Sequence, residues 1–293
     1  MSKILVVGGA GFLGSHVADR LTASGHNVTI FDQVKSPYLN DEQSMIVGNL
    51  ENAEEIKKAV QGQDIVYNFA CIADIKEASE NPIDVAKTNV IGHINLLEGS
   101  AHSAVQRFIY ASTLYVYSRS GSFYRTSKQA AELFIEGFHE EFGLPYTIIR
   151  YGTLYGPRAP EWNGFYQLLR KALETGKLEY QGSGEEVREF LHVYDAADCC
   201  INLLDDEYEN LKIIVNGPHS IKGGDLVALV SEIFNGKLEV VYRYEESKRP
   251  GHYVRTPFAF KPELAKQLNM KSYISLGQGI LDYLNELNPE VDK

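Results

Sequence analysis

Apolar runs typical of buried strands alternate with amphipathic segments through the first half of the chain. The first run, Lys3 to Val7, leads directly into Gly8, Gly11 and Gly14, which follow one another at three-residue spacing. A helix is expected after this turn, from about Ser15 to Ser24. The same patterns predict further strands at 28–31, 44–47, 64–70 and 107–112, and further helices at 51–60, 84–100 and 124–142.

The glycine turn predicts a dinucleotide-binding site. One glycine permits a tight bend, one lets a pyrophosphate approach the backbone, and one lets the helix pack closely on the strand. The N–H groups at the start of the helix then face the phosphates. Asp32 ends the second strand at roughly the twenty-residue offset where a carboxylate binds ribose hydroxyls. Because it would repel a 2′-phosphate and no Arg stands at Gln33 or Val34, the sequence favours NAD over NADP.

Alternation of strands and helices predicts an α/β fold with a Rossmann-type, doubly wound parallel sheet. From Gly156 onward the composition shifts toward turns, which indicates a smaller C-terminal α/β domain over the cofactor cleft. We therefore expect an NAD-binding Rossmann domain over residues 1–157 and a substrate-binding domain over 158–293. The strand-like run from Lys212 to Asn216 predicts that about 189–216 returns to the first domain.

Charge and composition narrow the function classes. The formal net charge of −11 argues against nucleic-acid binding, which needs a basic surface. Cys71, Cys199 and Cys200 form no metal-binding or disulfide pattern, so we expect no metal site and interpret them as small buried side chains. No signal peptide or membrane-length apolar run is visible, which predicts a cytoplasmic protein without a membrane partner.

Tyr124 and Lys128 are the candidate catalytic pair. Four residues apart on a predicted helix, they share one face, and an ammonium beside a phenol lowers the phenol pKa toward neutrality. The spacing alone proves little, because Tyr208/Lys212 and Tyr244/Lys248 repeat it. Tyr124 differs in following a strand that ends at the carboxyl edge of the sheet, where a cofactor binds.

With these residues in place, the chain resembles the extended short-chain dehydrogenase/reductases, specifically the NAD-dependent nucleotide-sugar epimerase/dehydratase family with its UDP-glucose 4-epimerase-like enzymes. The resemblance runs nearly end to end. Besides the glycines and Asp32, its landmarks are Asn68-Phe69-Ala70, Asn89-Val90-x-Gly92, Ser112-Thr113-x-x-Val116-Tyr117, Tyr124-x-x-Ser127-Lys128-x-x-x-Glu132, Arg150-Tyr151-Gly152-Thr153-Leu154-Tyr155-Gly156-Pro157-Arg158, Arg188-Glu189-Phe190-Leu191-His192-Val193-x-Asp195 and Arg249-Pro250-Gly251-His252.

The resemblance implies a role for each matched position. Tyr124 is implied as the acid/base, Lys128 as the residue that holds the nicotinamide ribose, and Thr113 as the hydrogen-bond partner of the reacting hydroxyl. The implied NAD contacts are Gly8, Gly11, Phe12, Leu13, Asp32, Asn49, Leu50, Ala70, Asn89, Tyr124, Lys128 and Tyr151. The implied contacts to a nucleotide-diphosphate sugar are Thr113, Thr153, Arg188 and Arg249, whereas His192 is interpreted as a packed or hydrogen-bonded side chain.

The resemblance also ranks the possible reactions. A nucleotide-sugar 4-epimerase is the leading hypothesis, because Leu114-Tyr115 stands where dehydratases carry an Asp-Glu pair and where decarboxylases carry a carboxylate at Tyr115. An NAD(P)H-dependent nucleotide 4-keto-sugar reductase is the alternative; a 4,6-dehydratase and a non-catalytic, cofactor-sensing protein rank lower. The resemblance further implies a homodimer formed through the helices around 84–100 and 128–142.

Overall fold

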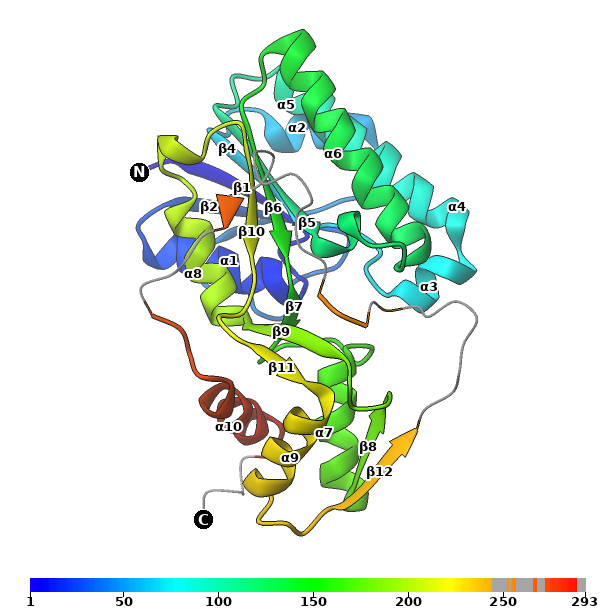
Figure 1. Ribbon diagram of the computed structural model, residues 1–293. Coiled ribbons are helices and arrows are strands. Elements are labelled where there is room, and N and C mark those ends of the chain that lie inside the picture. Colours follow the sequence, from blue (N-terminus) through cyan, green and yellow to red (C-terminus); the bar gives the residue numbers. More distant parts are fainter. Residues whose placement is uncertain (244–251, 253, 257–265, 268–271, 289–293) are drawn as a thin grey trace.

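The centre of the molecule is a parallel sheet of eight strands in the order β13-β10-β6-β5-β4-β1-β2-β3 (Figure 1). This computed structural model describes residues 1–243, 252, 254–256, 266–267 and 272–288. The strands of the large sheet are β1 (Lys3–Val7), β2 (Asn27–Asp32), β3 (Ser44–Val47), β4 (Ile65–Asn68), β5 (Arg107–Thr113), β6 (Tyr146–Tyr151), β10 (Leu211–Val215) and β13 (Lys266–Gln267).

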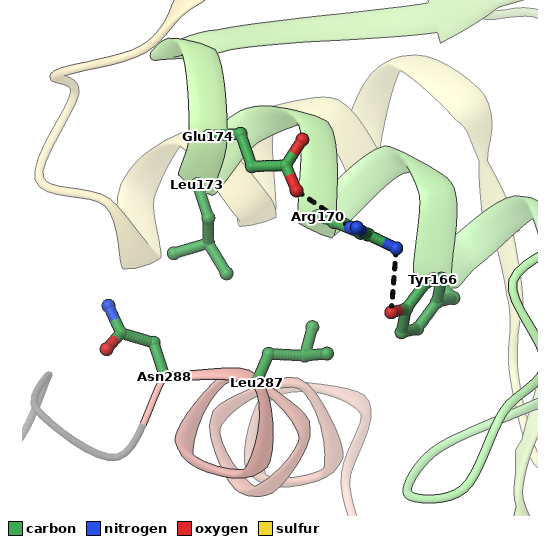
Figure 2. Close-up of a pocket in the computed structure, with 6 residues that line it drawn as sticks. All are labelled: Tyr166, Arg170, Leu173, Glu174, Leu287 and Asn288. Carbon is green, nitrogen blue, oxygen red and sulfur yellow. Dashed lines mark hydrogen bonds and ion pairs between the residues drawn. The ribbon is translucent and has the colours of Figure 1, made fainter.

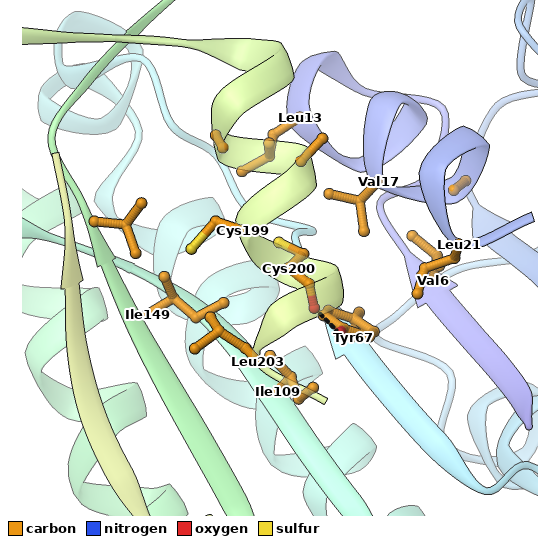
Figure 3. Close-up of a cluster of buried hydrophobic side chains, with 14 of the residues drawn as sticks. Val6, Leu13, Val17, Leu21, Tyr67, Ile109, Ile149, Cys199, Cys200 and Leu203 are labelled. Carbon is orange, nitrogen blue, oxygen red and sulfur yellow. Dashed lines mark hydrogen bonds between the residues drawn. The ribbon is translucent and has the colours of Figure 1, made fainter. Parts of the chain in front are cut away.

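Helices cover both faces of this sheet, which confirms the predicted doubly wound Rossmann fold. One face packs against α1 (Phe12–Ala23) and α8 (Val193–Asn202), and the other against α2 (Ala53–Val60), α5 (His93–Ala101) and α6 (Ser122–Phe142). Figure 3 shows Val17 of α1 and Cys200 of α8 meeting the side chains of the central strands. The apolar runs are buried on both sides because both faces of the sheet are covered.

The carboxyl ends of the central strands meet at one edge, where the strand order reverses on either side of β1. Val7 is paired with Phe31 of β2 and with Asn68 of β4. Two strands further along, Thr113 of β5 is paired with Tyr151 of β6. Such a reversal point is where open α/β sheets bind ligands.

The C-terminal part of the chain adds a smaller lobe with two sheets of its own. Its three-stranded sheet contains β7 (Thr153–Tyr155), β9 (Val187–His192) and β11 (Ser220–Lys222), and its two-stranded sheet contains β8 (Lys177–Gln181) and β12 (Glu239–Arg243). Its helices are α7 (Gly164–Thr175), α9 (Gly223–Ile233) and α10 (Leu276–Leu287). Between these elements the chain returns to the large sheet through α8 and β10, while the domain boundary at residue 157 stays a prediction.

The predicted helix over 84–100 is confirmed, but it is not an α-helix throughout. It consists of α4 (Pro82–Val85), a π-helical segment η1 (Ala86–Gly92) and α5, and it follows a short helix α3 (Ile75–Glu80). A π turn shifts the direction of the side chains by one residue, which periodicity cannot reveal. The 3₁₀ segments are η2 (Leu114–Tyr117) and η3 (Asp206–Tyr208). Among the described residues no helix has the length and apolarity to cross a membrane.

Candidate active site

The turn after β1 requires its glycines for steric reasons. Gly8 has φ of +79°, and a Cβ there would lie 2.5 Å from the backbone nitrogen of Ala70. A Cβ on Gly14 would overlap the carbonyl oxygen of Gly8. The helix α1 then starts at Phe12, three residues earlier than predicted, and Gly11 offers no side chain to cap it. The first N–H groups of α1, including those of Phe12 and Leu13, are therefore donors for an anion at this edge.

Asp32 lies beside this turn at the end of β2. Its Oδ2 accepts a hydrogen bond from the Ala10 N–H at 3.0 Å and its Oδ1 accepts from the Val34 N–H at 3.3 Å. The carboxylate is thus fixed against the glycine turn, where ribose hydroxyls would meet it. Asn49 is held by its own loop, because its Oδ1 accepts from the Glu51 N–H at 2.9 Å. Leu50 is buried.

Ala70 and Asn89 line the next part of the edge. The Ala70 N–H donates to Oδ1 of Asn68 at 3.0 Å. The amide of Asn89, within η1, accepts from the Ile72 N–H at 2.7 Å and donates to the Ile72 carbonyl and to Oγ of Ser127, both at 3.0 Å. Since the polar atoms of Asn89 are engaged in this way, it braces the cofactor edge against α6 rather than offering a free group.

Thr113, Tyr124 and Lys128 come together where β5 ends beside α6. The side chain of Thr113 forms a hydrogen bond with the phenol of Tyr124. The Lys128 ammonium lies 5.8 Å from the centre of the Tyr124 ring and donates to the Ala111 carbonyl at 2.6 Å. Lys128 is only 2% exposed, so its charge acts on Tyr124 with little screening by water. The predicted catalytic residues therefore do form one cluster.

The predicted direction of the Tyr124 pKa is wrong. Burial raises this pKa above its usual value, and the opposing effects of the Lys128 charge and the Thr113 hydrogen bond do not cancel it. The spacing of Tyr and Lys reveals the opposing charge but not the degree of desolvation. Tyr124 is accordingly a neutral phenol in the protein alone, positioned to exchange a proton with a ligand hydroxyl.

A buried charged network under this cluster was not foreseen. Oγ of Ser112 donates to Oε1 of Glu132 at 2.5 Å, and the guanidinium of Arg150 binds the same carboxylate through Nε at 3.0 Å and Nη2 at 2.5 Å. Nη1 of Arg150 donates to the hydroxyl of Tyr117. Ser112, Tyr117, Glu132 and Arg150 all stand among the landmarks of the resemblance, but nothing in the sequence indicates that they contact one another.

Tyr151 and the cysteines lie as follows. The Tyr151 hydroxyl lies 2.9 Å from Sγ of Cys200 within the hydrophobic cluster, and the contact of Tyr151 with NAD stays a prediction. Cys199 and Cys200 are buried, as predicted. Cys71 is not, because it lies half-buried in the loop after β4, close enough for its charge state to affect Tyr124.

Two of the predicted substrate residues, Thr153 and Arg188, lie in the smaller lobe, whereas Thr113 ends β5 of the large sheet. Thr153 of β7 pairs with Phe190 of β9, and Arg188 is two residues away on the same strand. Arg249 lies outside the described residues. His192 is buried, accepts from the Tyr194 N–H at 3.3 Å as the cap of α8, and has a pKa lowered by burial to about 4. This confirms its interpretation as a packed, hydrogen-bonded side chain.

Comparison with known proteins identifies the family. The model of the NAD dependent epimerase/dehydratase family matches residues 4–216. The chain belongs to this family. A UDP-N-acetyl-alpha-D-glucosaminuronate decarboxylase of Bacillus cytotoxicus is 29% identical to it, over 95% of this chain and 95% of the relative.

Solved structures of family enzymes align with nearly the whole chain. The UDP-glucuronic acid 4-epimerase of Bacillus cereus, solved with UDP-glucuronic acid and NAD, is 25% identical with a TM-score of 0.86, over 98% of this chain and 99% of that chain. The UDP-glucose 4-epimerase of Thermotoga maritima, solved with UDP-glucose, is 25% identical with a TM-score of 0.82 over the same shares.

NAD is the cofactor of this family, and the residues of the edge fit it. The glycines let the turn pack directly on Ala70 and on the start of α1, the uncapped start of α1 offers N–H donors to a pyrophosphate, and Asp32 supplies acceptors for ribose hydroxyls. A separate cavity of about 230 Å³ lies between α7 and α10 and is lined by none of the predicted site residues (Figure 2). The described chain contains no group of three or more His, Cys, Asp and Glu side chains that could hold a metal ion.

Proposed function

We propose that this family member is an NAD-dependent nucleotide-sugar 4-epimerase. The observation that carries the proposal is the cluster of Thr113, Tyr124 and Lys128 beside the glycine turn. A phenol next to a hydroxyl acceptor and a buried ammonium suits reversible proton exchange with a sugar hydroxyl. The same cluster suits any reaction that oxidises a sugar hydroxyl or reduces a sugar ketone, so the choice of an epimerase needs a further argument.

That argument comes from the residue that follows the cluster. Tyr115 is a phenol whose ring packs 6.1 Å from the ring of Tyr124, in the place where the resemblance expects a carboxylate in a dehydratase or decarboxylase. Near pH 7 an ordinary phenol keeps its proton, whereas an ordinary carboxylate is ionised and can accept one. Without a carboxylate there, oxidation at C4 followed by return of the hydride on the other face is the simplest complete cycle.

The residues act in a fixed order. In the site with its cofactor bound, Tyr124 first releases its own proton to solvent, and Lys128 stabilises the resulting phenolate. The phenolate then takes the proton of the C4 hydroxyl while Thr113 holds its oxygen, and NAD when bound supplies the hydride acceptor and later the hydride donor. After the 4-keto sugar turns over in the site, Tyr124 returns the proton to the oxygen at C4. Arg188, with Thr153 beside it, binds the diphosphate of the substrate, because a guanidinium suits bidentate contacts to phosphate.

The test is incubation of the purified protein with NAD and a panel of UDP-, dTDP-, GDP- and CDP-sugars, followed by chromatography with mass detection. A new peak of unchanged mass supports the epimerase. A product lighter by carbon dioxide would replace it by a decarboxylase, the activity named for the Bacillus cytotoxicus relative, and loss of water would replace it by a dehydratase. Product formed only in proportion to added NAD(P)H from a 4-keto sugar would establish the reductase.

The role of Tyr124 is tested by Tyr124→Phe. We expect kcat to fall by about 10² to 10⁴, because the proton exchange is lost, while NAD binding stays within about twofold. The matched control is Tyr166→Phe, which removes an exposed phenol hydroxyl bonded at 3.3 Å to Arg170 on α7. Full activity of Tyr124→Phe would exclude this residue as the acid/base.

We also propose a homodimer formed by the helices that cover one side of the large sheet. Exposed apolar side chains gather on α4, η1 and α6, which pack against one another (Figure 1). Ile83 is 69% exposed, Leu133 is 67% exposed, and Ile91, Phe134 and Phe142 are also exposed. Large apolar side chains that share a surface in this way indicate association.

A further inference from the structure

Tyr115 is held in one position next to Thr113 and Tyr124 of the catalytic cluster. Its backbone N–H donates to Oγ1 of Thr113 at 3.2 Å. Its ring stands edge-on to the Tyr124 ring, with centres 6.1 Å apart, and rests on Gly121, where a Cβ would lie only 2.7 Å from the ring. Backbone and ring are therefore held by the Rossmann part of the chain, and the hydroxyl is left to reach outward.

The hydroxyl of Tyr115 meets a residue from the other end of the chain. Its Oη lies 2.5 Å from Nδ1 of His252, and the two ring centres are 6.2 Å apart. His252 precedes a segment that runs along β9: the Val187 N–H donates to the Val254 carbonyl at 2.9 Å, and the Thr256 N–H donates to the Val187 carbonyl at 3.1 Å. The contact therefore links η2, which holds Tyr115 beside Tyr124, to the segment that pairs with the strand carrying Arg188.

The charge state of His252 suits this contact. Although His252 is exposed, desolvation by the protein atoms around its ring and then the positive charge of Arg188 lower its pKa, and the opposing effect of Asp74 is smaller. The imidazole is neutral near pH 7 and carries one N–H, so the direction of its hydrogen bond with the Tyr115 hydroxyl follows the tautomer. Because Tyr115 follows β5 and the segment after His252 pairs with β9, the contact lies at the junction of the two lobes.

We propose that Tyr115 and His252 are positioning residues that close the nucleotide-sugar site by holding the lobe with Arg188 against the lobe with Tyr124. The proposal rests on the proposed function for its consequence in catalysis, but not for the contact itself. Since the pair acts by holding the two lobes together, its loss weakens binding of substrate and transition state alike. That combination raises KM and leaves kcat nearly unchanged.

The decisive variant is Tyr115→Phe, which removes the hydroxyl and keeps the ring on Gly121. In the free protein, we expect amide hydrogen exchange at Val187 and Thr256 to become about three- to tenfold faster, as loss of one neutral hydrogen bond allows. With UDP as the probe, calorimetry should show a Kd raised by a similar factor, and KM for a turned-over UDP-sugar should rise with kcat within about twofold.

Four further variants sharpen this test. Tyr166→Phe, at a half-buried phenol on α7, should change neither exchange nor affinity. His252→Ala should match Tyr115→Phe, His252→Asn should restore part of the loss because its side-chain oxygen accepts a hydrogen bond, and the double variant should be no worse than either single one.

Two results would overturn the proposal. Exchange at Val187 and Thr256 in Tyr115→Phe within twofold of the wild type would show that the contact does not hold the lobes. A loss in kcat with KM unchanged would make Tyr115 part of the chemistry instead of the closure. A wild type that turns over no nucleotide sugar would end the proposed function, while the exchange measurement would still decide the contact.

Discussion

The buried pair of Glu132 and Arg150 gives the sharpest prediction about stability. Both side chains are 6% exposed, and two charge-assisted hydrogen bonds join them at 2.5 and 3.0 Å. In Arg150→Met the Glu132 carboxylate stays buried with only the Ser112 hydroxyl to bind it. Removing one partner of a buried ion pair leaves an uncompensated charge and typically costs about 3–5 kcal/mol.

Thermal unfolding followed by circular dichroism is the assay. A loss of about 3–5 kcal/mol corresponds to a fall in Tm of roughly 6 to 20 °C, at about 2–4 °C per kcal/mol for a large domain. The matched control is Arg170→Met on α7. Arg170 is 46% exposed and pairs with Glu161 and Glu174, so its loss should cost less than about 1 kcal/mol.

The double variant Glu132→Gln/Arg150→Met separates charge from packing. Because the amide carries no charge, we expect it to recover at least half of the loss seen in Arg150→Met. A Tm for Arg150→Met within about 2 °C of the wild type would refute the reasoning. A double variant less stable than Arg150→Met would likewise show that the cost does not come from an unpaired buried carboxylate.

Three other outcomes follow from single residues. Burial raises the pKa of Asp195 to about 6, so the folded protein holds this carboxyl neutral at low pH and loses stability as the pH rises from 3.8 through 6. Asp195→Asn should therefore gain stability relative to the wild type between pH 4 and 7, by up to about 3 kcal/mol. A stability difference in urea unfolding that does not change with pH would contradict this. Gly14→Ala should weaken NAD binding at least about tenfold, or about 1.4 kcal/mol, in calorimetry, since its Cβ overlaps the carbonyl oxygen of Gly8; unchanged affinity would mean that the turn shifts freely. Leu133→Asp should convert a dimer into a monomer in light scattering, by placing a charge on an apolar interface, and an unchanged mass would move the interface elsewhere.

Local sequence determined the cofactor half of this protein. Short-range rules govern that region: an apolar run forms a buried strand, closely spaced glycines form the turn that follows, and a carboxylate ends the next strand. Gly8, Gly14 and Asp32 consequently lie where the spacing predicts them. Tyr124 and Lys128 share a face of α6 for the same reason, because the geometry of one helix fixes that relation.

The four-residue spacing alone did not distinguish the pair Tyr124/Lys128 from the pair Tyr208/Lys212. Tyr208 belongs to η3 and Lys212 to β10, so the second pair shares no helix. The secondary structure around each pair decides whether it forms a site. That secondary structure in turn depends on the packing of the sheet.

Tertiary structure decided what depends on residues far apart in the chain. The pKa of Tyr124 follows from desolvation, which no neighbouring residue in the sequence reports. Arg150 meets Glu132 only because β6 lies against α6, and Tyr115 meets His252 across 137 positions of the chain. Contacts of this kind form when elements that are distant in the sequence pack together. A sequence pattern shows which residues share one element, but not which residues of two elements meet. The sequence by itself therefore determined the fold class and the cofactor turn, while packing decided the electrostatics and the closure of the site.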